Sequence, residues 1–221
     1  MKTVARHRPK LLTAENLPAA PCQQRSVDKR ARLKKAGLEL FGERGYEKTS
    51  VDQIARRAKL AVGGFYQHFR SKRQLLLTLM DELVEHLSRL DLQPTGARDA
   101  RTALHELLSA AFARDLRYLG AYRAWEEAVL SDPALARQHK ALHAWTTGRV
   151  MTVFLALQQR PGARPAVDVA ALARAMDTFF WSLLARAVRM SQAELMQSID
   201  AATHLIYHAL FTDRPGTRRM G

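Results

Sequence analysis

Residues 49–72 read TSVDQIARRAKLAVGGFYQHFRSK, and this stretch decides the fold. Ser50 is followed three residues later by Gln53, the spacing of a capping box, which predicts that a helix begins near Val51. The apolar residues at its start recur at helical spacing: Val51, Ile54, Ala55 and Ala58. This apolar face of about two turns is too short to be stable as a helix without packing on another element.

A second short helix is expected from about Val62 to Phe69, after a connection of roughly three or four residues around Leu60. Phe65 and Phe69 lie one turn apart and are expected on its inner face. Two short helices joined by a tight turn form a helix-turn-helix, and the second helix has the right diameter for the major groove of DNA. The stretch therefore predicts a DNA-binding element.

Longer helices are expected on both sides of this element. The first should run from about Val27 to Arg44, with Gly45 as its stop. The other opens at Ser71, whose spacing to Gln74 again has the form of a capping box, and its leucines continue at helical spacing to Leu90. The polar run at 93–96, with Pro94 and Gly96, is expected to end it and to mark a domain boundary.

The order of residues across these helices resembles the N-terminal domain of the TetR family of bacterial transcriptional regulators. The residues that carry the resemblance are Ala36, Leu40, Phe41, Gly45, Tyr46, Thr49, Ser50, Ile54, Ala55, Ala58, Gly63, Phe65, Tyr66, His68, Phe69, Ser71 and Lys72. The resemblance implies an all-helical homodimer, with a three-helix DNA-binding domain followed by a helical ligand-binding and dimerisation domain. It further implies a regulator, here expected to be a repressor, that releases a palindromic operator when a small-molecule effector binds.

The resemblance also supplies candidate contacts to double-stranded DNA. They are Arg30, Arg32, Thr49, Ser50, Val62, Gly63, Gly64, Tyr66, Gln67, His68 and Lys72. Tyr66 and His68 match positions that contact phosphates in similar proteins, although packing of Tyr66 under the first helix is an alternative. Gln67 would project outwards and pair bidentately with adenine. Lys72 is expected in the first turn of a helix, where a nearby phosphate would offset its unfavourable position in the helix dipole.

Two positions depart from the family pattern. Lys59 stands where similar sequences usually have Gly, because the chain there adopts positive φ, and a Lys adds a steric cost of roughly 1 kcal/mol. Ala61 and Val62 stand where members often have a hydroxyl residue followed by a polar one. Base reading is therefore expected to depend on other positions.

The charge distribution agrees with a nucleic-acid partner. The net charge is +14, and residues 1–90 carry 19 basic and 9 acidic side chains against 16 and 12 in the rest. An excess of this sign concentrates a polyanion near the surface, but charge alone does not distinguish DNA from RNA or anionic lipid. We interpret residues 1–26 as a disordered basic arm that either reaches DNA or is a solvated tail.

After the DNA-binding domain, residues 27–91, five further helices are expected in a second domain at 97–211, followed by a polar tail at 212–221. Asp132 before Pro133 has the form of a helix start. The family resemblance pairs the last two helices with those of a second subunit. The candidate contact positions are Ala170, Leu172, Ala175, Phe179, Leu183, Leu205 and Ala209.

Aromatic residues of this second domain are candidate walls of an apolar ligand pocket, although most such residues are ordinary core. The candidates are Tyr122, Trp125, Trp145, Phe154, Phe180 and Trp181. Trp125, beside Glu126 and Glu127, is the preferred pocket edge, and these acids would suit a cationic or hydroxyl-bearing ligand.

Two other classes of function remain open. One is a metal-responsive regulator that uses two histidine pairs, His139 with His143 and His204 with His208, whose i,i+4 spacing can chelate zinc. Each pair lacks a third ligand nearby in sequence, so we assign no metal and no cofactor. The run from His105 begins like a zinc-protease helix but has Ser109 in place of the second His. A helical enzyme is the other alternative, and no nucleophile elbow or phosphate-binding loop supports it.

Cysteine usage and hydropathy bear on the compartment. Cys22 is the sole cysteine, so no intrachain disulfide can form, and no segment approaches the ~20 apolar residues of a membrane span. We expect a cytoplasmic protein without a membrane partner.

Overall fold

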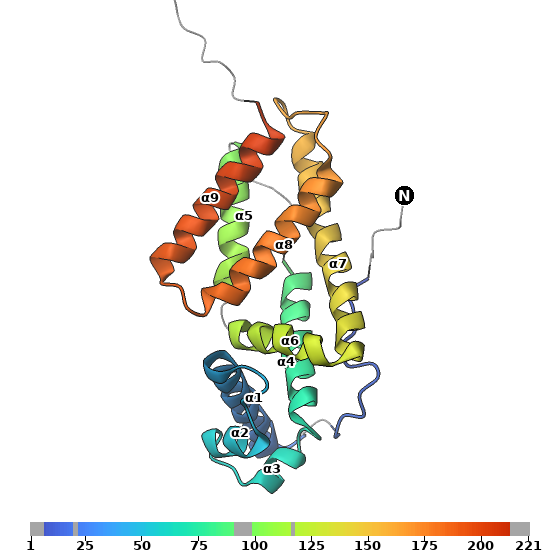
Figure 1. Cartoon of the computed structure of the whole chain (residues 1–221), viewed down its shortest axis with the longest axis vertical. Coiled ribbons are helices and arrows are strands. Elements are labelled where there is room, and N and C mark those ends of the chain that lie inside the picture. Colours follow the sequence, from blue (N-terminus) through green and yellow to red (C-terminus); the bar gives the residue numbers. More distant parts are fainter. Residues whose placement is uncertain (1–6, 20–21, 91–98, 116–117, 213–221) are drawn as a thin grey trace, which may run out of the picture.

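The computed structural model describes residues 7–19, 22–90, 99–115 and 118–212. Its regular elements in these ranges are all helices, which confirms the expected all-α class. They are α1 (Gln24–Arg44), α2 (Val51–Arg57), α3 (Val62–Tyr66), α4 (Lys72–Ser88), α5 (Ala100–Asp115), α6 (Leu119–Ser131), α7 (Pro133–Gln158), α8 (Val169–Ala187) and α9 (Gln192–Leu210). Figure 1 shows α1–α3 at one end of the molecule and α5, α7, α8 and α9 at the other, with α4 running between them.

The helix-turn-helix forms as its spacing predicts. The Ser50 hydroxyl accepts from the Gln53 backbone and the Gln53 side chain accepts from the Ser50 backbone, which completes the capping box. Lys59 adopts φ +57°, so the turn keeps the left-handed geometry that usually takes Gly. The second helix is shorter than expected and ends at Tyr66, after which Phe69 is still fully buried.

The expected second capping box, at Ser71, is only half present. The Ser71 hydroxyl accepts from the Gln74 backbone at 3.1 Å, as predicted. The Gln74 side chain instead accepts from the Arg70 backbone at 2.9 Å and donates to the Asn16 carbonyl at 3.2 Å. The N-terminal segment competes for this amide, and a local spacing rule does not include such a distant partner.

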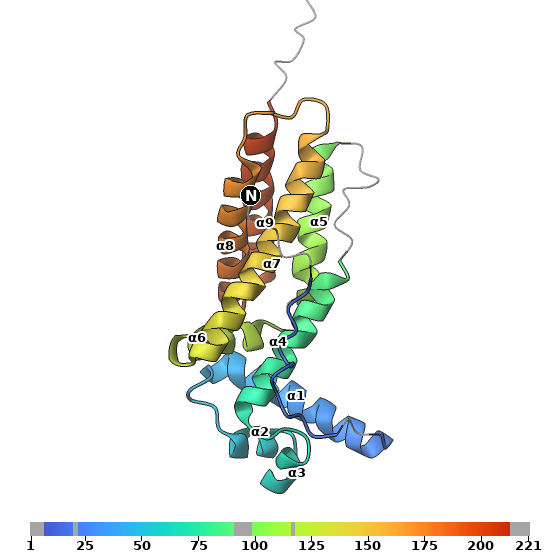
Figure 2. The same ribbon diagram turned by 90° about the vertical axis from the view of Figure 1, so that its right-hand side faces the viewer.

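Residues 7–19 pack along the body of the protein, so the prediction of a disordered arm is wrong for them. Arg8 pairs with Asp81 of α4 at 2.5 Å, and Leu11 is 1% exposed. Gln138 of α7 donates to the Leu11 carbonyl at 3.0 Å. Figure 2 shows this segment, in dark blue, running beside α4. The first residues of the chain and the tail after Thr212 lie outside the described residues.

A close helix crossing joins the two ends of the molecule. α6 crosses α1 where Gly42 and Gly120 meet, and a Cβ on Gly120 would overlap the Leu38 carbonyl oxygen. Arg123 donates to the Gly42 carbonyl at 2.6 Å. Glu127 accepts from the Tyr46 backbone at 2.7 Å, just after α1 ends. The helix-turn-helix is therefore fixed to α6 as well as to α4.

The other end is a bundle of long helices, and the five expected helices are all found there and in α6. Asp132 caps α7 by accepting from Ala134 and Leu135, with Pro133 in the first turn. Figure 2 shows α8 and α9 side by side along the bundle. The expected break at 93–96 lies outside the described residues. None of the helices in the described ranges is long and apolar enough to cross a membrane.

Candidate functional site

The outer face of α3 and the residues just after it form an exposed surface. Phe65 and Phe69 are fully buried and anchor the helix to the core, as predicted. The side chains that point outwards are those of Ala61, Val62, Tyr66, Gln67 and Arg70. Tyr66 is 52% exposed, so the alternative of packing under the first helix is excluded. Gly63, also exposed, has no atom within 4 Å of an added Cβ, and Gly64 contacts only Leu60.

Two predicted DNA contacts are instead buried structural residues. Thr49 is 2% exposed, and its hydroxyl donates to the Gly45 carbonyl at 2.7 Å. His68 is 3% exposed and its carbonyl accepts from Arg30. Burial, with Arg30 and Lys29 nearby, lowers the pKa of His68 below 6.5 and favours the neutral ring. Neither side chain is available to a phosphate.

Two predicted phosphate ligands have partners inside the chain. Arg30 donates to the His68 carbonyl at 3.1 Å and lies over the Phe69 ring, and burial lowers its pKa. Lys72 donates to the carbonyls of Tyr46 (2.8 Å) and Thr49 (3.2 Å). The ammonium group of Lys72 is thus stabilised by carbonyl oxygens, where the sequence suggested a phosphate.

The remaining candidates are accessible. Arg32 is exposed on α1, and Ser50 is exposed at the start of α2. Arg70 is exposed just after α3, although it was not predicted. Its signal was its place between the buried Phe69 and the cap Ser71, which leaves the intervening side chain to solvent. The accessible groups at this end of the molecule are therefore cationic, hydroxyl and amide groups. The glycines at the start of α3, Gly63 and Gly64, leave its backbone without covering side chains.

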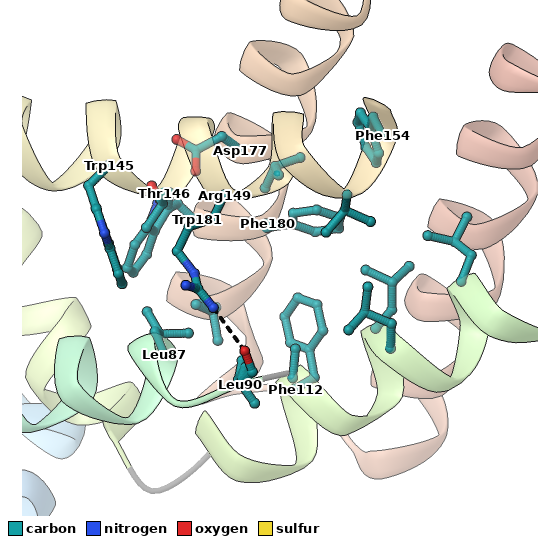
Figure 3. Close-up of a pocket in the computed structure, with 17 residues that line it drawn as sticks. Leu87, Leu90, Phe112, Trp145, Thr146, Arg149, Phe154, Asp177, Phe180 and Trp181 are labelled. Carbon is teal, nitrogen blue, oxygen red and sulfur yellow. Dashed lines mark hydrogen bonds between the residues drawn. The ribbon is translucent and has the colours of Figure 1, made fainter. Parts of the chain in front are cut away.

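The bundle contains a partly open cavity of ≈ 130 Å³ between α4, α5, α7 and α8. Four of the six predicted pocket residues line it: Trp145, Phe154, Phe180 and Trp181 (Figure 3). Trp125, the preferred edge, does not line it, because its indole N–H donates to His139 at 3.0 Å in the core. Tyr122 does not line the cavity either. Its ring stacks on that of Trp181, with 4.7 Å between the ring centroids, and burial raises its pKa above 10.

The polar groups of the cavity are not the predicted acids. Glu127 accepts backbone N–H groups near the end of α1 instead. Thr146, Arg149 and Asp177 line the cavity. The hydroxyl of Thr146 accepts from Trp181 at 3.1 Å. Arg149 was missed, although its spacing from Trp145 and Val153 places it on the same helix face.

The histidine pairs do not gather further ligands in the described part of the chain. The rings of His139 and His143 lie 4.3 Å apart, and those of His204 and His208 4.2 Å apart. His143 donates to Asp177 at 2.9 Å. His139 accepts from Trp125, and burial lowers its pKa. No group of three metal-ligating side chains that could hold an ion occurs among the described residues.

The last two helices expose several apolar side chains. Leu205 is 59% exposed and Met196 37%, both on α9. Ala175 of α8 is also exposed. Ala170, Leu172, Phe179 and Ala209 are half-buried. Leu183 is 6% exposed and belongs to the core of its own subunit, so its prediction as a contact position is wrong.

Comparison with known proteins agrees with this arrangement. Residues 33–79 match the family model described as bacterial regulatory proteins, tetR family. The uncharacterised HTH-type transcriptional regulator YuxN of Bacillus subtilis is 33% identical over 82 residues, 37% of this chain and 28% of YuxN. The HTH-type transcriptional regulator TcmR of Streptomyces glaucescens is 38% identical over 68 residues, 30% of each chain. The matched part covers less than a third of either relative.

Solved structures share the fold over most of the chain. A TetR family transcriptional regulator from Pseudomonas syringae pv. tomato is 24% identical, with a TM-score of 0.60 over 84% of this chain and 98% of that one. The SmeT–triclosan complex is 21% identical, with a TM-score of 0.63 over 86% and 96%. The N-terminal sequence match and this shared fold together lead to one conclusion: residues 33–79 carry the DNA-binding domain of the TetR family of bacterial regulatory proteins, in a chain that folds as solved TetR family regulators do.

Proposed function

We propose that this protein is a ligand-responsive transcriptional repressor that binds a palindromic operator as a homodimer. The observation that carries the proposal is the outer face of α3, where Tyr66 and Gln67 are exposed while Phe65 anchors the helix below. An exposed helix of this kind is the element that reads the major groove in helix-turn-helix proteins. The curated relatives are named as transcriptional regulators, and the protein would act where chromosomal DNA lies, in the cytoplasm.

Recognition would divide between phosphate and base contacts. Three exposed side chains would contact phosphates, those of Arg32 on α1, Ser50 before α2 and Arg70 after α3, as would the exposed Tyr66 hydroxyl. Gln67 would read a base edge, and the bare start of α3 at Gly63 allows the backbone to approach DNA closely. No catalytic group is proposed, and no cofactor.

The dimer would form through α8 and α9. Leu205 would be covered by the same helices of a second subunit, because burial of this exposed apolar side chain would stabilise a dimer. Two recognition helices would then face successive major grooves about 34–36 Å apart.

The cavity would hold the effector. The SmeT structure is a complex with triclosan, a small molecule, and this chain shares its fold. The cavity adjoins α4, which begins beside the helix-turn-helix. An effector that favours one position of α4 would therefore shift the spacing of the two recognition helices.

Fluorescence anisotropy tests the proposal, using duplexes that cover the intergenic regions next to the protein's own gene. The wild type should bind one of these duplexes. The logarithm of its binding constant should fall linearly with the logarithm of the salt concentration, and the slope of that line is the quantity compared. Arg32→Ala and Arg70→Ala should each lower the slope by about one unit, because each phosphate contact releases about one counterion. Arg137→Ala, an exposed arginine of α7, is the matched control and should leave the slope unchanged. Equal slopes for all four proteins would refute the proposed interface.

A further inference from the structure

Arg149 is a cation that lines a largely apolar cavity. Its guanidinium donates to the Leu90 carbonyl at 3.0 Å and lies 5.3 Å from the centre of the Trp145 ring. Burial lowers its pKa below 12.5, and no nearby carboxylate opposes that shift. Arg149 forms no ion pair within the described residues, so no carboxylate of that part of the chain compensates its charge.

Asp177, the acid that the described residues contribute to the cavity wall, already has a hydrogen-bond partner. Asp177 is 3% exposed, and His143 donates to its carboxylate at 2.9 Å. Figure 3 shows the Arg149 guanidinium reaching towards Leu90 and away from the Asp177 carboxylate. Among the described residues, the cavity therefore presents a cation without an ion pair at one side and a hydrogen-bonded acid at the other.

The size and lining of the cavity limit the apolar part of a ligand. Its volume is ≈ 130 Å³, and most of its walls are leucine, valine and aromatic side chains. A cavity of about 150 Å³ with a similar lining is large enough for benzene. The apolar part of the ligand should therefore be about one aromatic ring, or a chain of roughly six to eight carbon atoms.

We propose that the cavity binds a small monocarboxylate, aromatic or medium-chain aliphatic, whose carboxylate pairs with Arg149 and whose apolar part lies against Trp145, Phe112 and Phe180. This assignment rests on the proposed function only in taking the cavity as the effector site. A guanidinium and a carboxylate form two parallel hydrogen bonds, stronger than the bond to a neutral carbonyl. The apolar remainder replaces empty space within van der Waals reach of the aromatic rings.

The same contact gives the ligand a route to the DNA-binding end. Leu90 follows the last turn of α4, which ends at Ser88. A carboxylate competes with the Leu90 carbonyl for the Arg149 guanidinium, so binding weakens the link between α7 and the end of α4. The other end of α4 starts at Lys72, next to the turn that follows α3.

Calorimetric titration of the full-length protein without DNA tests the ligand class. The probes are octanoate, 1-octanol and octylammonium, which share a chain length and differ in charge. Octanoate should bind at least about 10-fold more tightly than 1-octanol, because a charge-assisted pair is lost with the alcohol. Equal affinity for octanoate and 1-octanol, tighter binding of octylammonium, or no binding of any probe would each overturn the proposal.

Variants assign the effect to Arg149. Arg149→Met should weaken octanoate binding about 10–100-fold and change 1-octanol binding by less than about 3-fold. Arg149→Lys should keep the preference for octanoate over the alcohol, which excludes a merely structural role. Arg137→Met, on the exposed side of the same helix, should bind all probes as the wild type does. An unchanged octanoate affinity in Arg149→Met would refute the assignment.

A second titration, with DNA, separates this inference from the proposed function. Octanoate should weaken DNA binding by the wild type and not by Arg149→Met. If octanoate binds through Arg149 but leaves DNA affinity unchanged, the ligand class is supported and the coupling through Leu90 is refuted.

Discussion

At the scale of single residues, burial separates side chains that hold the helix-turn-helix together from side chains that are free to recognise a partner. Thr49 and His68 fall in the first group and Tyr66 in the second, although all three match the family pattern. A family position therefore does not give a residue's role until its exposure is known. Lys72 shows the same point, because its ammonium group already has two acceptors.

Lys72→Ala is predicted to act on stability. The substitution removes two hydrogen bonds to the carbonyls of Tyr46 and Thr49 and the contact of the ammonium group with the Tyr46 ring. The free energy of unfolding in urea should fall by about 1–3 kcal/mol. A variant of unchanged stability with a lower salt slope in DNA binding would instead identify Lys72 as a phosphate ligand.

At the scale of helices, the α1–α6 crossing is the closest link between the DNA-binding end and the bundle. It is close because both helices have Gly at the crossing, Gly42 and Gly120, so the backbones approach without side chains between them. The polar contacts from Arg123 and Glu127 then fix the orientation of α6 on α1. A change in the orientation of α6 should therefore move the end of α1, which precedes the helix-turn-helix.

Gly120→Ala is predicted to separate these helices. The added methyl group would overlap the Leu38 carbonyl oxygen and lie 2.8 Å from the Gly42 nitrogen, and both of these are backbone atoms. Thermal unfolding should show that the free energy of unfolding of this variant is lower than that of the wild type by about 1–3 kcal/mol. Gly63→Ala is the matched control, because its methyl group meets nothing within 4 Å, and it should be at least as stable as the wild type. Equal stability of the two variants would argue against the close crossing.

At the scale of the whole molecule, the proposed dimer depends on apolar side chains that a single subunit leaves uncovered. Leu205 on α9 and Leu130 on α6 are 59% and 89% exposed. Only Leu205 lies on the helices proposed to form the interface, so the two residues form a matched pair for a test.

Leu205→Glu is predicted to give a monomer, because it would bury a charge between two subunits. Leu130→Glu should remain a dimer. Light scattering after size exclusion measures the mass of each variant, and the Leu205→Glu monomer should bind operator DNA at least about 100-fold more weakly. If Leu205→Glu stays dimeric, the interface lies elsewhere.

Local rules predicted the helices well, and tertiary contacts explain what they missed. The Ser50 capping box and the Asp132–Pro133 start depend on residues a few positions apart, so the sequence shows them directly. The packing of Arg8 on Asp81 joins residues 73 positions apart, and no local pattern contains it. The cavity shows both cases: four of its aromatic residues were predicted, whereas the helical spacing of Arg149 gives its face but not that this face points into a cavity.

The central claim is that two copies of the exposed α3 face read DNA together, and selection from a pool of randomised duplexes tests it most directly. The wild type should enrich an inverted repeat whose half-site centres lie about 10–10.5 base pairs, or a multiple of that, apart. Gln67→Ala should keep the repeat but lose preference at one base pair in each half-site. Enrichment of no inverted repeat, or an identical motif from Gln67→Ala, would contradict the account.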